Sequence, residues 1–198
     1  MPKKAIFLKN SSSNDKMQPV KRKVLPKPFF EGGTIFLRPL SLTDISERYL
    51  LWLNDPDINR YNSHAVFPYT SEQLKDYVKG INAKEKVVLA IVDKKTKKHI
   101  GNISLQNIDW VARSAEFAIL IGEKEFWGKK IGEEAGKLII RYGFERLNLN
   151  RIHCGTSSEN LGMQKLAVKL GMKREGTERQ AIYKNGKYTD IFEYGILR

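Results

Sequence analysis

The sequence lacks the features that would place it in a membrane, among disulfide-rich secreted proteins or around a thiolate metal centre. Cys154 is the only cysteine in 198 residues, so an internal disulfide and a cluster of cysteine ligands are both excluded. No apolar run approaches the ~18 residues that a membrane helix needs. The apolar run at residues 5–8 is too short for the core of a signal peptide. We therefore expect a cytoplasmic protein with no metal and no membrane partner.

Positive charge is abundant and unevenly placed. The chain has 35 lysines and arginines against 22 acidic residues, which gives a net charge of +13. Residues 1–28 hold eight of these cations and one acid, and they are rich in Ser, Asn and Pro. This composition predicts a flexible basic arm ahead of a single domain at residues 29–198. The arm is either a solubilising tail, which is the simpler interpretation, or a segment that contacts RNA, a ribosome or an anionic membrane.

Hydrophobic periodicity predicts a mixed α/β domain with a partly antiparallel sheet. Runs of strand length alternate with segments of helical spacing. Asn-Gly at residues 185–186 is a strong hairpin signal. The expected strands are residues 34–37, 87–92, 99–105, 115–121, 151–155 and two that flank residues 184–186. The expected helices run from Thr43 or Ser41 to about Leu53, from 72 to about 81 after Ser71, from Gly128 to about 147, and from Asn160 to about Leu170.

The loop before the third expected helix has the composition of a phosphate-binding turn. It joins a strand to a helix with the sequence WGKKIG, residues 127–132. The free amides and positive dipole of a helix start suit a pyrophosphate, and glycine lets a ligand approach the backbone. The segment is neither a Walker loop nor a GxGxxG dinucleotide motif. Taken alone, it is better interpreted as an ordinary strand-to-helix turn.

Four segments supply a context for this loop. They read HIGNISL at 99–105, AEFAILIGEKEFWGKKIGEEA at 115–135, ENLGMQKLAVKLGMKREG at 159–176 and NGKYTDIFEYGIL at 185–197. In these segments and their order the chain resembles the GCN5-related N-acetyltransferase (GNAT) superfamily, and within it the branch of the ribosomal-protein N-acetyltransferases. The resemblance covers everything after the basic arm. It implies the GNAT fold, a mixed, mostly antiparallel sheet flanked by helices.

The resemblance implies an acetyl-coenzyme A (acetyl-CoA) site around the WGKKIG loop. In the family the amides of this loop hold the pyrophosphate, and two neighbouring strands separate to admit the pantetheine arm. Lys130 stands where the family usually has its first glycine, so it either pairs with a phosphate or obstructs it; we favour retained binding. Asn160 suits both a cofactor contact and a helix cap. The cofactor-binding residues implied are Ile119, Leu120, Ile121, Trp127, Gly128, Lys129, Lys130, Ile131, Gly132 and Asn160.

Glu116 is the expected base, because an alkyl ammonium has to lose a proton before it attacks a thioester. It is the only charge in SAEFAILIG, on a strand that we expect to be buried on both faces, and it lies 11 residues before Trp127, as in some family members. A structural carboxylate paired with Arg113 or another cation is an equally good interpretation. The proton donors usual in the family are replaced by Met163 and Ala167.

Tyr183 is a candidate acid beside the hairpin turn, although strand packing explains it more simply, and water or direct thiolate release is the other option. Trp52, His64 and Tyr69 are candidate contacts of the acceptor, against the simpler interpretation of core packing and a surface histidine. Cys154 has no evident histidine–acid relay, so we expect no covalent intermediate.

The function that follows is transfer of acetyl from acetyl-CoA to a primary amine of a small molecule. An amino sugar or a nucleotide-linked amino sugar leads, because YLLWLNDPDINRY at 49–61 resembles family members that act on amino sugars. The alternatives are acetylation of a protein N-terminus, as in the ribosomal-protein type, and a non-catalytic protein that binds coenzyme A. A homodimer is a further expectation, since the family often pairs through sheet edges.

Overall fold

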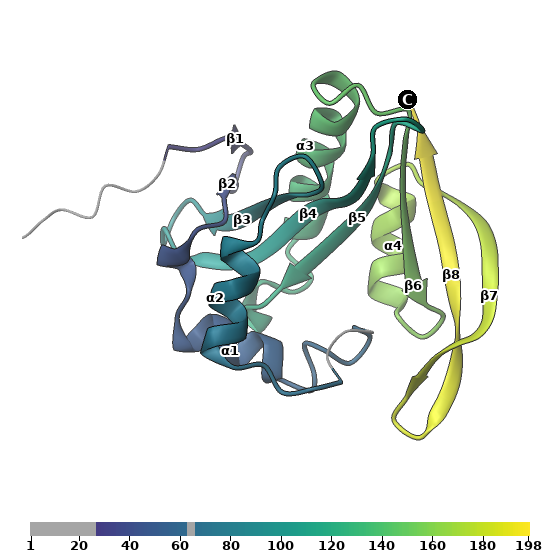
Figure 1. The fold of residues 1–198 in the computed structure, drawn as a ribbon, viewed down its shortest axis with the longest axis horizontal. Coiled ribbons are helices and arrows are strands. Elements are labelled where there is room, and N and C mark those ends of the chain that lie inside the picture. Colours follow the sequence, from purple (N-terminus) through teal and green to yellow (C-terminus); the bar gives the residue numbers. More distant parts are fainter. Residues whose placement is uncertain (1–26, 63–65) are drawn as a thin grey trace, which may run out of the picture.

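The computed structural model describes residues 27–62 and 66–198, so most of the expected basic arm and His64 lie outside the described residues. The described chain forms one eight-stranded sheet with helices on both faces (Figure 1). The strands are β1 (Phe30–Glu31), β2 (Ile35–Pro39), β3 (Val87–Asp93), β4 (His99–Asp109), β5 (Ser114–Ile121), β6 (Arg151–Ser157), β7 (Lys173–Lys184) and β8 (Lys187–Leu197). The helices are α1 (Glu47–Asn54), α2 (Ser71–Lys79), α3 (Ile131–Glu145) and α4 (Leu161–Lys169).

The sheet is mostly antiparallel, as predicted. Its strand order is β1-β2-β3-β4-β5-β6-β8-β7, and β5 with β6 is the parallel pair. That pair needs a crossover connection, which α3 supplies. The mixed, mostly antiparallel fold expected from the resemblance is therefore confirmed.

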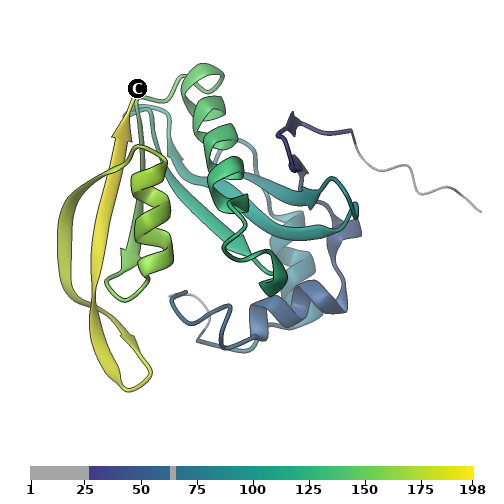
Figure 2. The same cartoon turned by 180° about the vertical axis from the view of Figure 1, so that it is seen from behind.

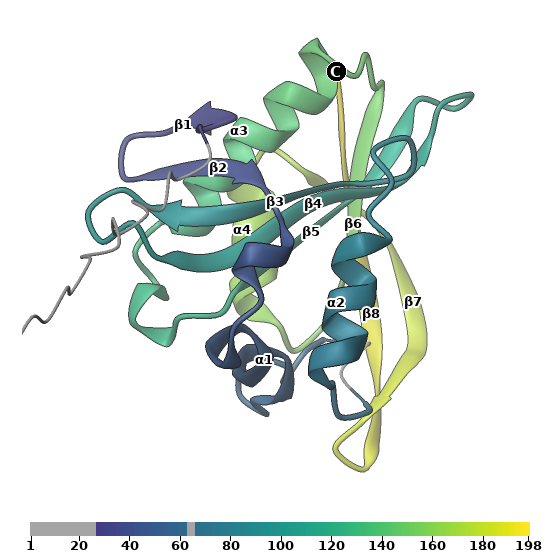
Figure 3. The same ribbon diagram turned by 60° about the vertical axis from the view of Figure 1, so that its left-hand side comes forward.

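Two apolar cores lie on opposite faces of the sheet. Residues of β2 alternate between them: Ile35 and Leu37 join the core beneath α3 and α4, while Phe36 joins the core beneath α1 and α2. Seen from behind, α3 and α4 lie together over one face of the sheet (Figure 2). Figure 3 shows α1 and α2 on the other side. The middle of the sheet is therefore buried on both faces.

The parallel strands β5 and β6 begin side by side and then separate. Their pairing is confined to residues 114–116 of β5 and 151–153 of β6. Beyond Glu116, the side of β5 that faces β6 has no ladder partner in the described chain. This is the separation that the family resemblance implied, and it leaves a gap between β5 and β6 within the sheet.

Several helix and strand boundaries differ from those expected. Helix α1 begins later than Thr43, because Ser46 is its cap and accepts a hydrogen bond from the backbone N–H of Tyr49 at 3.2 Å. Helix α3 begins at Ile131 because Gly128 and Lys130 have φ of 74° and 63°, which a right-handed helix excludes. Strand β4 runs past residue 105 to Asp109 through a bulge.

Candidate functional site

A cleft of about 1370 Å³ opens where β5 and β6 separate. One part of its lining comes from the loop before α3 and the starts of α3 and α4. The other part comes from one face of the sheet and from residues 57–62, which follow α1. The cleft therefore extends from the WGKKIG loop to a second surface, which is formed by side chains of the sheet and of the segment after α1.

The start of α3 leaves backbone donors available at the cleft. Lys130 is its N-cap in the left-handed conformation, and among the described residues no side chain caps this helix. At this end of the helix, the amide of Glu134 donates to the carbonyl of Lys130 at 3.0 Å. The amides of the first turn are thus free to bind an anion, which is the fit that a pyrophosphate needs.

The two glycines of the loop serve different purposes. Gly128 has φ +74°, a conformation that side chains rarely adopt, and open space surrounds it. Gly132 has an ordinary φ, but a Cβ there would lie 3.2 Å from Leu166 Cδ2. Gly128 therefore shapes the turn, and Gly132 lets the start of α3 pack closely against α4.

All the residues expected to bind the cofactor line the cleft except Lys129. The ammonium of Lys129 lies over the Phe126 ring, 5.3 Å from its centroid. The Trp127 indole donates a hydrogen bond to the carbonyl of Ile121 at 2.9 Å, which ties the loop to β5. Asn160 caps α4, since its Oδ1 accepts from the backbone N–H of Met163 at 3.1 Å. Their contacts with a cofactor stay a prediction.

Glu116 lies in the cleft and is half-buried, so the expectation of full burial is wrong. Its strand is open on the side from which β6 departs. Its partner is not Arg113, because Asn107 Nδ2 donates to Glu116 Oε2 at 2.8 Å. Asn107 has φ +51° and sits where the register of β4 shifts against β5. The bulge therefore aims this amide at the candidate base.

Two further glutamates, which sequence reasoning missed, share the cleft with Glu116. Glu193 of β8 lies opposite Gly155 of β6, and Glu178 comes from β7. Burial, and after it the charges of Glu178 and Glu116, raises the pKa of Glu193 above its usual value. His153 of β6 is the register partner of Glu116 and also lines the cleft. This surface is therefore acidic, with one imidazole among the carboxylates.

A count from the hairpin turn would have placed these two glutamates on neighbouring strands, but not beside Glu116. Lys184 pairs with Lys187, and an unbroken register from there would set Glu178 opposite Glu193. Register shifts in β7 instead place Glu178 opposite Ile191. The two carboxylates stay on neighbouring strands at the same end of the sheet. Their proximity to Glu116 depends on the strand order, which the local sequence does not contain.

The other candidate residues have different positions. Tyr183 is 61% exposed and its ring packs against Tyr188, with centroids 4.8 Å apart, outside the cleft lining. The packing interpretation fits this position, and the proton-donor role does not. Trp52 is buried at 4% exposure, makes an edge-to-face contact with the His99 ring and does not line the cleft, so its substrate contact is not supported. Tyr69 does line the cleft, half-buried.

Cys154 does not act in the cleft. It is buried, and its Sγ lies 3.6 Å from Met172 Sδ. Burial raises the pKa of the thiol to about 12, with a smaller effect from the charge of Glu193. A buried thiol of this kind is a poor nucleophile.

None of the helices described is long and apolar enough to cross a membrane. No three His, Cys, Asp or Glu side chains in the described residues are close enough to hold a metal ion.

Comparison with known proteins shows what the chain is similar to. A family model, the acetyltransferase (GNAT) domain, matches residues 34–173. The spermidine N(1)-acetyltransferase of Escherichia coli (strain K12) is 30% identical over 169 residues, 83% of this chain and 87% of that protein. The putative ribosomal N-acetyltransferase YdaF of Bacillus subtilis (strain 168) is 38% identical over 98 residues, 50% of this chain and 53% of that protein.

A solved structure extends the comparison to the fold. The spermidine N-acetyltransferase from Vibrio cholerae, crystallised in complex with CoA and spermine, is similar with a TM-score of 0.75 at 28% identity. The match covers 83% of this chain and 95% of that one.

Proposed function

Because the chain belongs to the GNAT acetyltransferase family and takes its acetyl group from acetyl-CoA, we propose that its acceptor is a primary amine of a small molecule with more than one positive charge. The observation that carries the proposal is the group of three carboxylates, Glu116, Glu178 and Glu193, along one side of the cleft. One carboxylate is enough to serve the reacting amine. The other two are suited to a second ammonium group.

The same carboxylates weigh against one acceptor favoured on sequence grounds. A nucleotide-linked amino sugar carries a diphosphate, which three glutamates in the cleft would repel. A free amino sugar has a single ammonium and leaves two carboxylates unmatched. Spermidine, which the relatives in Escherichia coli and Vibrio cholerae are named for, has the charge that this surface favours.

The cofactor half of the cleft fits acetyl-CoA in its donors and its shape. The free amides at the start of α3 and the ammonium of Lys130 suit the pyrophosphate. The unpaired side of β5, at Ile119–Ile121, suits the amide-bearing pantetheine arm, with Asn160 across the gap. Bound there, acetyl-CoA supplies the thioester carbonyl that the amine attacks.

Glu116 is the residue that prepares the amine. Its carboxylate takes one proton from the substrate ammonium, which leaves a neutral nitrogen with a lone pair for attack. The hydrogen bond from Asn107 fixes one carboxylate oxygen, so that the other is available to the amine. A backbone N–H on the open side of β5 is suited to the negative charge that develops on the carbonyl oxygen. As the new C–N bond forms, the C–S bond of the thioester breaks and the nitrogen loses its second proton. That proton passes through water to the departing thiolate or to solvent, so that CoA leaves as the thiol or as the thiolate.

The test is a panel of acceptors with acetyl-CoA, followed by release of free CoA thiol and by mass spectrometry of the product. We expect spermidine to be acetylated faster than glucosamine, a nucleotide-linked amino sugar or a peptide with a free N-terminus. Glu116→Gln keeps an oxygen for Asn107 and should lower kcat by about 10²- to 10⁴-fold. Preference for the peptide would point to the ribosomal-protein type. Binding of acetyl-CoA without turnover of any amine would reject the proposal.

A further inference from the structure

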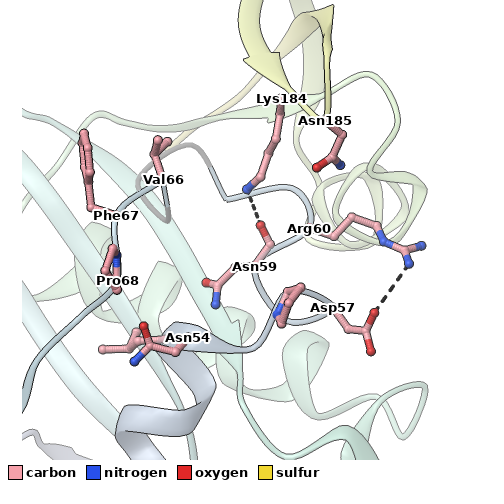
Figure 4. Close-up of a pocket in the computed structure, with 11 residues that line it drawn as sticks. Asn54, Asp57, Asn59, Arg60, Val66, Phe67, Pro68, Lys184 and Asn185 are labelled. Atoms are coloured by element: carbon pink, nitrogen blue, oxygen red, sulfur yellow. Dashed lines mark hydrogen bonds and ion pairs between the residues drawn. The ribbon is translucent and has the colours of Figure 1, made fainter.

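One lysine outside the reacting centre holds the segment that borders the acceptor side of the cleft. We call residues 55–62 the cleft wall; its members Asp57, Ile58, Arg60 and Tyr61 line the cleft. Lys184, the last residue of β7, donates from its Nζ to the backbone carbonyls of Asn59 and of Asn62, the latter at 2.6 Å. Figure 4 shows Lys184 reaching from the hairpin to Asn59, beside the ion pair of Arg60 with Asp57.

The environment of Lys184 is unusual for a lysine. No carboxylate among the described residues lies within 4.0 Å of its ammonium, and its partners are carbonyl oxygens. Burial lowers the pKa of Lys184 below its usual value. A half-buried ammonium without a counter-charge costs free energy, so its two hydrogen bonds to the wall are what compensates for leaving water.

The opposite side of the cleft wall is tied to the cofactor half. Lys124, just before the WGKKIG loop, pairs with Asp55 at 2.9 Å and with Asp57 at 2.7 Å. Within the wall, the buried Asn59 donates from Nδ2 to the carbonyl of Trp52 at 2.7 Å. The wall is therefore attached to α1 and to the cofactor loop, and Lys184 adds an attachment to the C-terminal hairpin.

The hairpin that carries Lys184 also carries two of the cleft carboxylates. Glu178 is on β7 and Glu193 is on β8. A shallow cavity of about 460 Å³, lined by residues that include Pro56, Phe67 and Asn185, separates the tip of the hairpin from the wall. Lys184 itself lines that cavity, and its two hydrogen bonds cross from the hairpin to the wall there.

We propose that Lys184 is a positioning residue that fixes the cleft wall against the β7–β8 hairpin and thereby sets the affinity for the acceptor, without contacting the reacting atoms. The cofactor half should depend on it less, because Lys184 holds the wall at Asn59 and Asn62, whereas the attachment to the cofactor loop runs from Asp55 and Asp57 to Lys124. The kinetic part of this inference rests on the proposed function, whereas the structural part does not.

The test compares Lys184→Met with wild type by hydrogen exchange and by kinetics. Lys184→Met removes the two hydrogen bonds that the ammonium donates to the carbonyls of the wall. Amide exchange of residues 55–62 should become faster by ~10-fold or more, and the KM of the acceptor should rise by a similar factor. The Kd of acetyl-CoA should stay within about twofold, since it reports the intact cofactor half. Lys184→Arg keeps a cationic donor and should restore part of the acceptor affinity.

Lys173→Met is the matched control, because Lys173 is exposed on the same strand. It should change neither exchange of the wall nor the acceptor KM. Unchanged wall exchange in Lys184→Met would overturn the inference, as would equal weakening of acceptor and acetyl-CoA. If no amine is turned over by wild type, the proposed function fails while the exchange experiment still decides the role of Lys184.

Discussion

Replacing Lys130 with glycine should increase the stability of the protein and lower its affinity for acetyl-CoA. Lys130 has φ +63° and ψ 9° at the N-cap of α3, in the left-handed region. A side chain in that region costs about 1–2 kcal/mol, and glycine removes this strain. Glycine also raises the conformational entropy of the unfolded chain, which lowers the free energy of unfolding by about 0.5–1 kcal/mol. The net expectation for Lys130→Gly is a gain of about 0.5–1 kcal/mol in the free energy of unfolding.

The cofactor effect should have the opposite sign. Lys130 lines the cleft beside the free amides of α3, so its ammonium is placed to pair with a phosphate oxygen. Loss of one such charged contact, about 1–1.5 kcal/mol, corresponds to a Kd for acetyl-CoA that is about 5- to 10-fold weaker. If Lys130 obstructs the phosphates instead, glycine will tighten binding.

Lys129→Gly is the matched control for both measurements. Lys129 carries the same charge one residue earlier, has no positive φ and does not line the cleft. It should lose about 0.5–1 kcal/mol of stability and keep its Kd within about twofold. Thermal unfolding of the apo proteins should move by ~2 °C in opposite directions, and calorimetric titration gives the two Kd values. If both variants change stability and affinity alike, the backbone strain and the phosphate contact assigned to Lys130 are refuted.

Three other substitutions test separate parts of the account. Asn107→Gly keeps a residue suited to φ +51° but removes the hydrogen bond to Glu116, so kcat should fall about 3- to 10-fold. Asn107→Asp places a second carboxylate beside Glu116 and should move the acidic limb of the pH–kcat/KM profile to higher pH. An unmoved limb would contradict the contact. Asp44→Ala breaks a buried pair with Arg38, joined at 2.7 Å, and should cost about 3–5 kcal/mol by urea unfolding. Burial is the largest single influence on the pKa of Asp44 and raises it, but the hydrogen bonds from Arg38 and Ser41 and the charge of Arg38 together outweigh burial and lower the pKa. This stabilisation is therefore present above about pH 3.9 and is lost as pH falls through the folded pKa; a pH dependence identical to that of Asp44→Ala would argue against it. Tyr183→Phe should leave kcat unchanged, and a tenfold loss would return Tyr183 to the role of proton donor.

Features encoded by local sequence were largely predictable. The Asn-Gly hairpin and the order of elements follow from short-range patterns, and the loop before α3 was located by its glycines and its place between a strand and a helix. The errors lie at element ends. Ser41 and Thr43 looked like caps for α1, but Ser41 begins a short 3-10 helix, Leu42–Asp44, in which Asp44 pairs with Arg38. Ser41 caps this short helix, where its backbone N–H donates to Asp44 Oδ2 at 2.9 Å, and Ser46 is left to cap α1.

The acceptor half of the site depends on long-range geometry, and most of it was missed. Glu178 and Glu193 read as ordinary exposed strand residues, because only the strand order brings them to Glu116. The sequence singles out Glu116 but not its exposure, because the departure of β6, which leaves that side of β5 open, is a long-range feature. From the sequence, Trp52 suits an acceptor pocket or, more simply, the core; its burial and its contacts with Tyr49 and His99 place it in the core.

The most direct test of the central claim is the ratio of kcat/KM for putrescine to that for butylamine, which share a carbon chain and differ by one amino group. The carboxylates Glu178 and Glu193 should favour the second ammonium, so the ratio should be ~10 or more in wild type. In the Glu178→Gln/Glu193→Gln double variant it should fall toward about two, the statistical value for a diamine with two equivalent amines, with the Kd of acetyl-CoA unchanged. A ratio near two in wild type, or a larger preference that survives in the double variant, would contradict an acceptor site built for a polycationic amine.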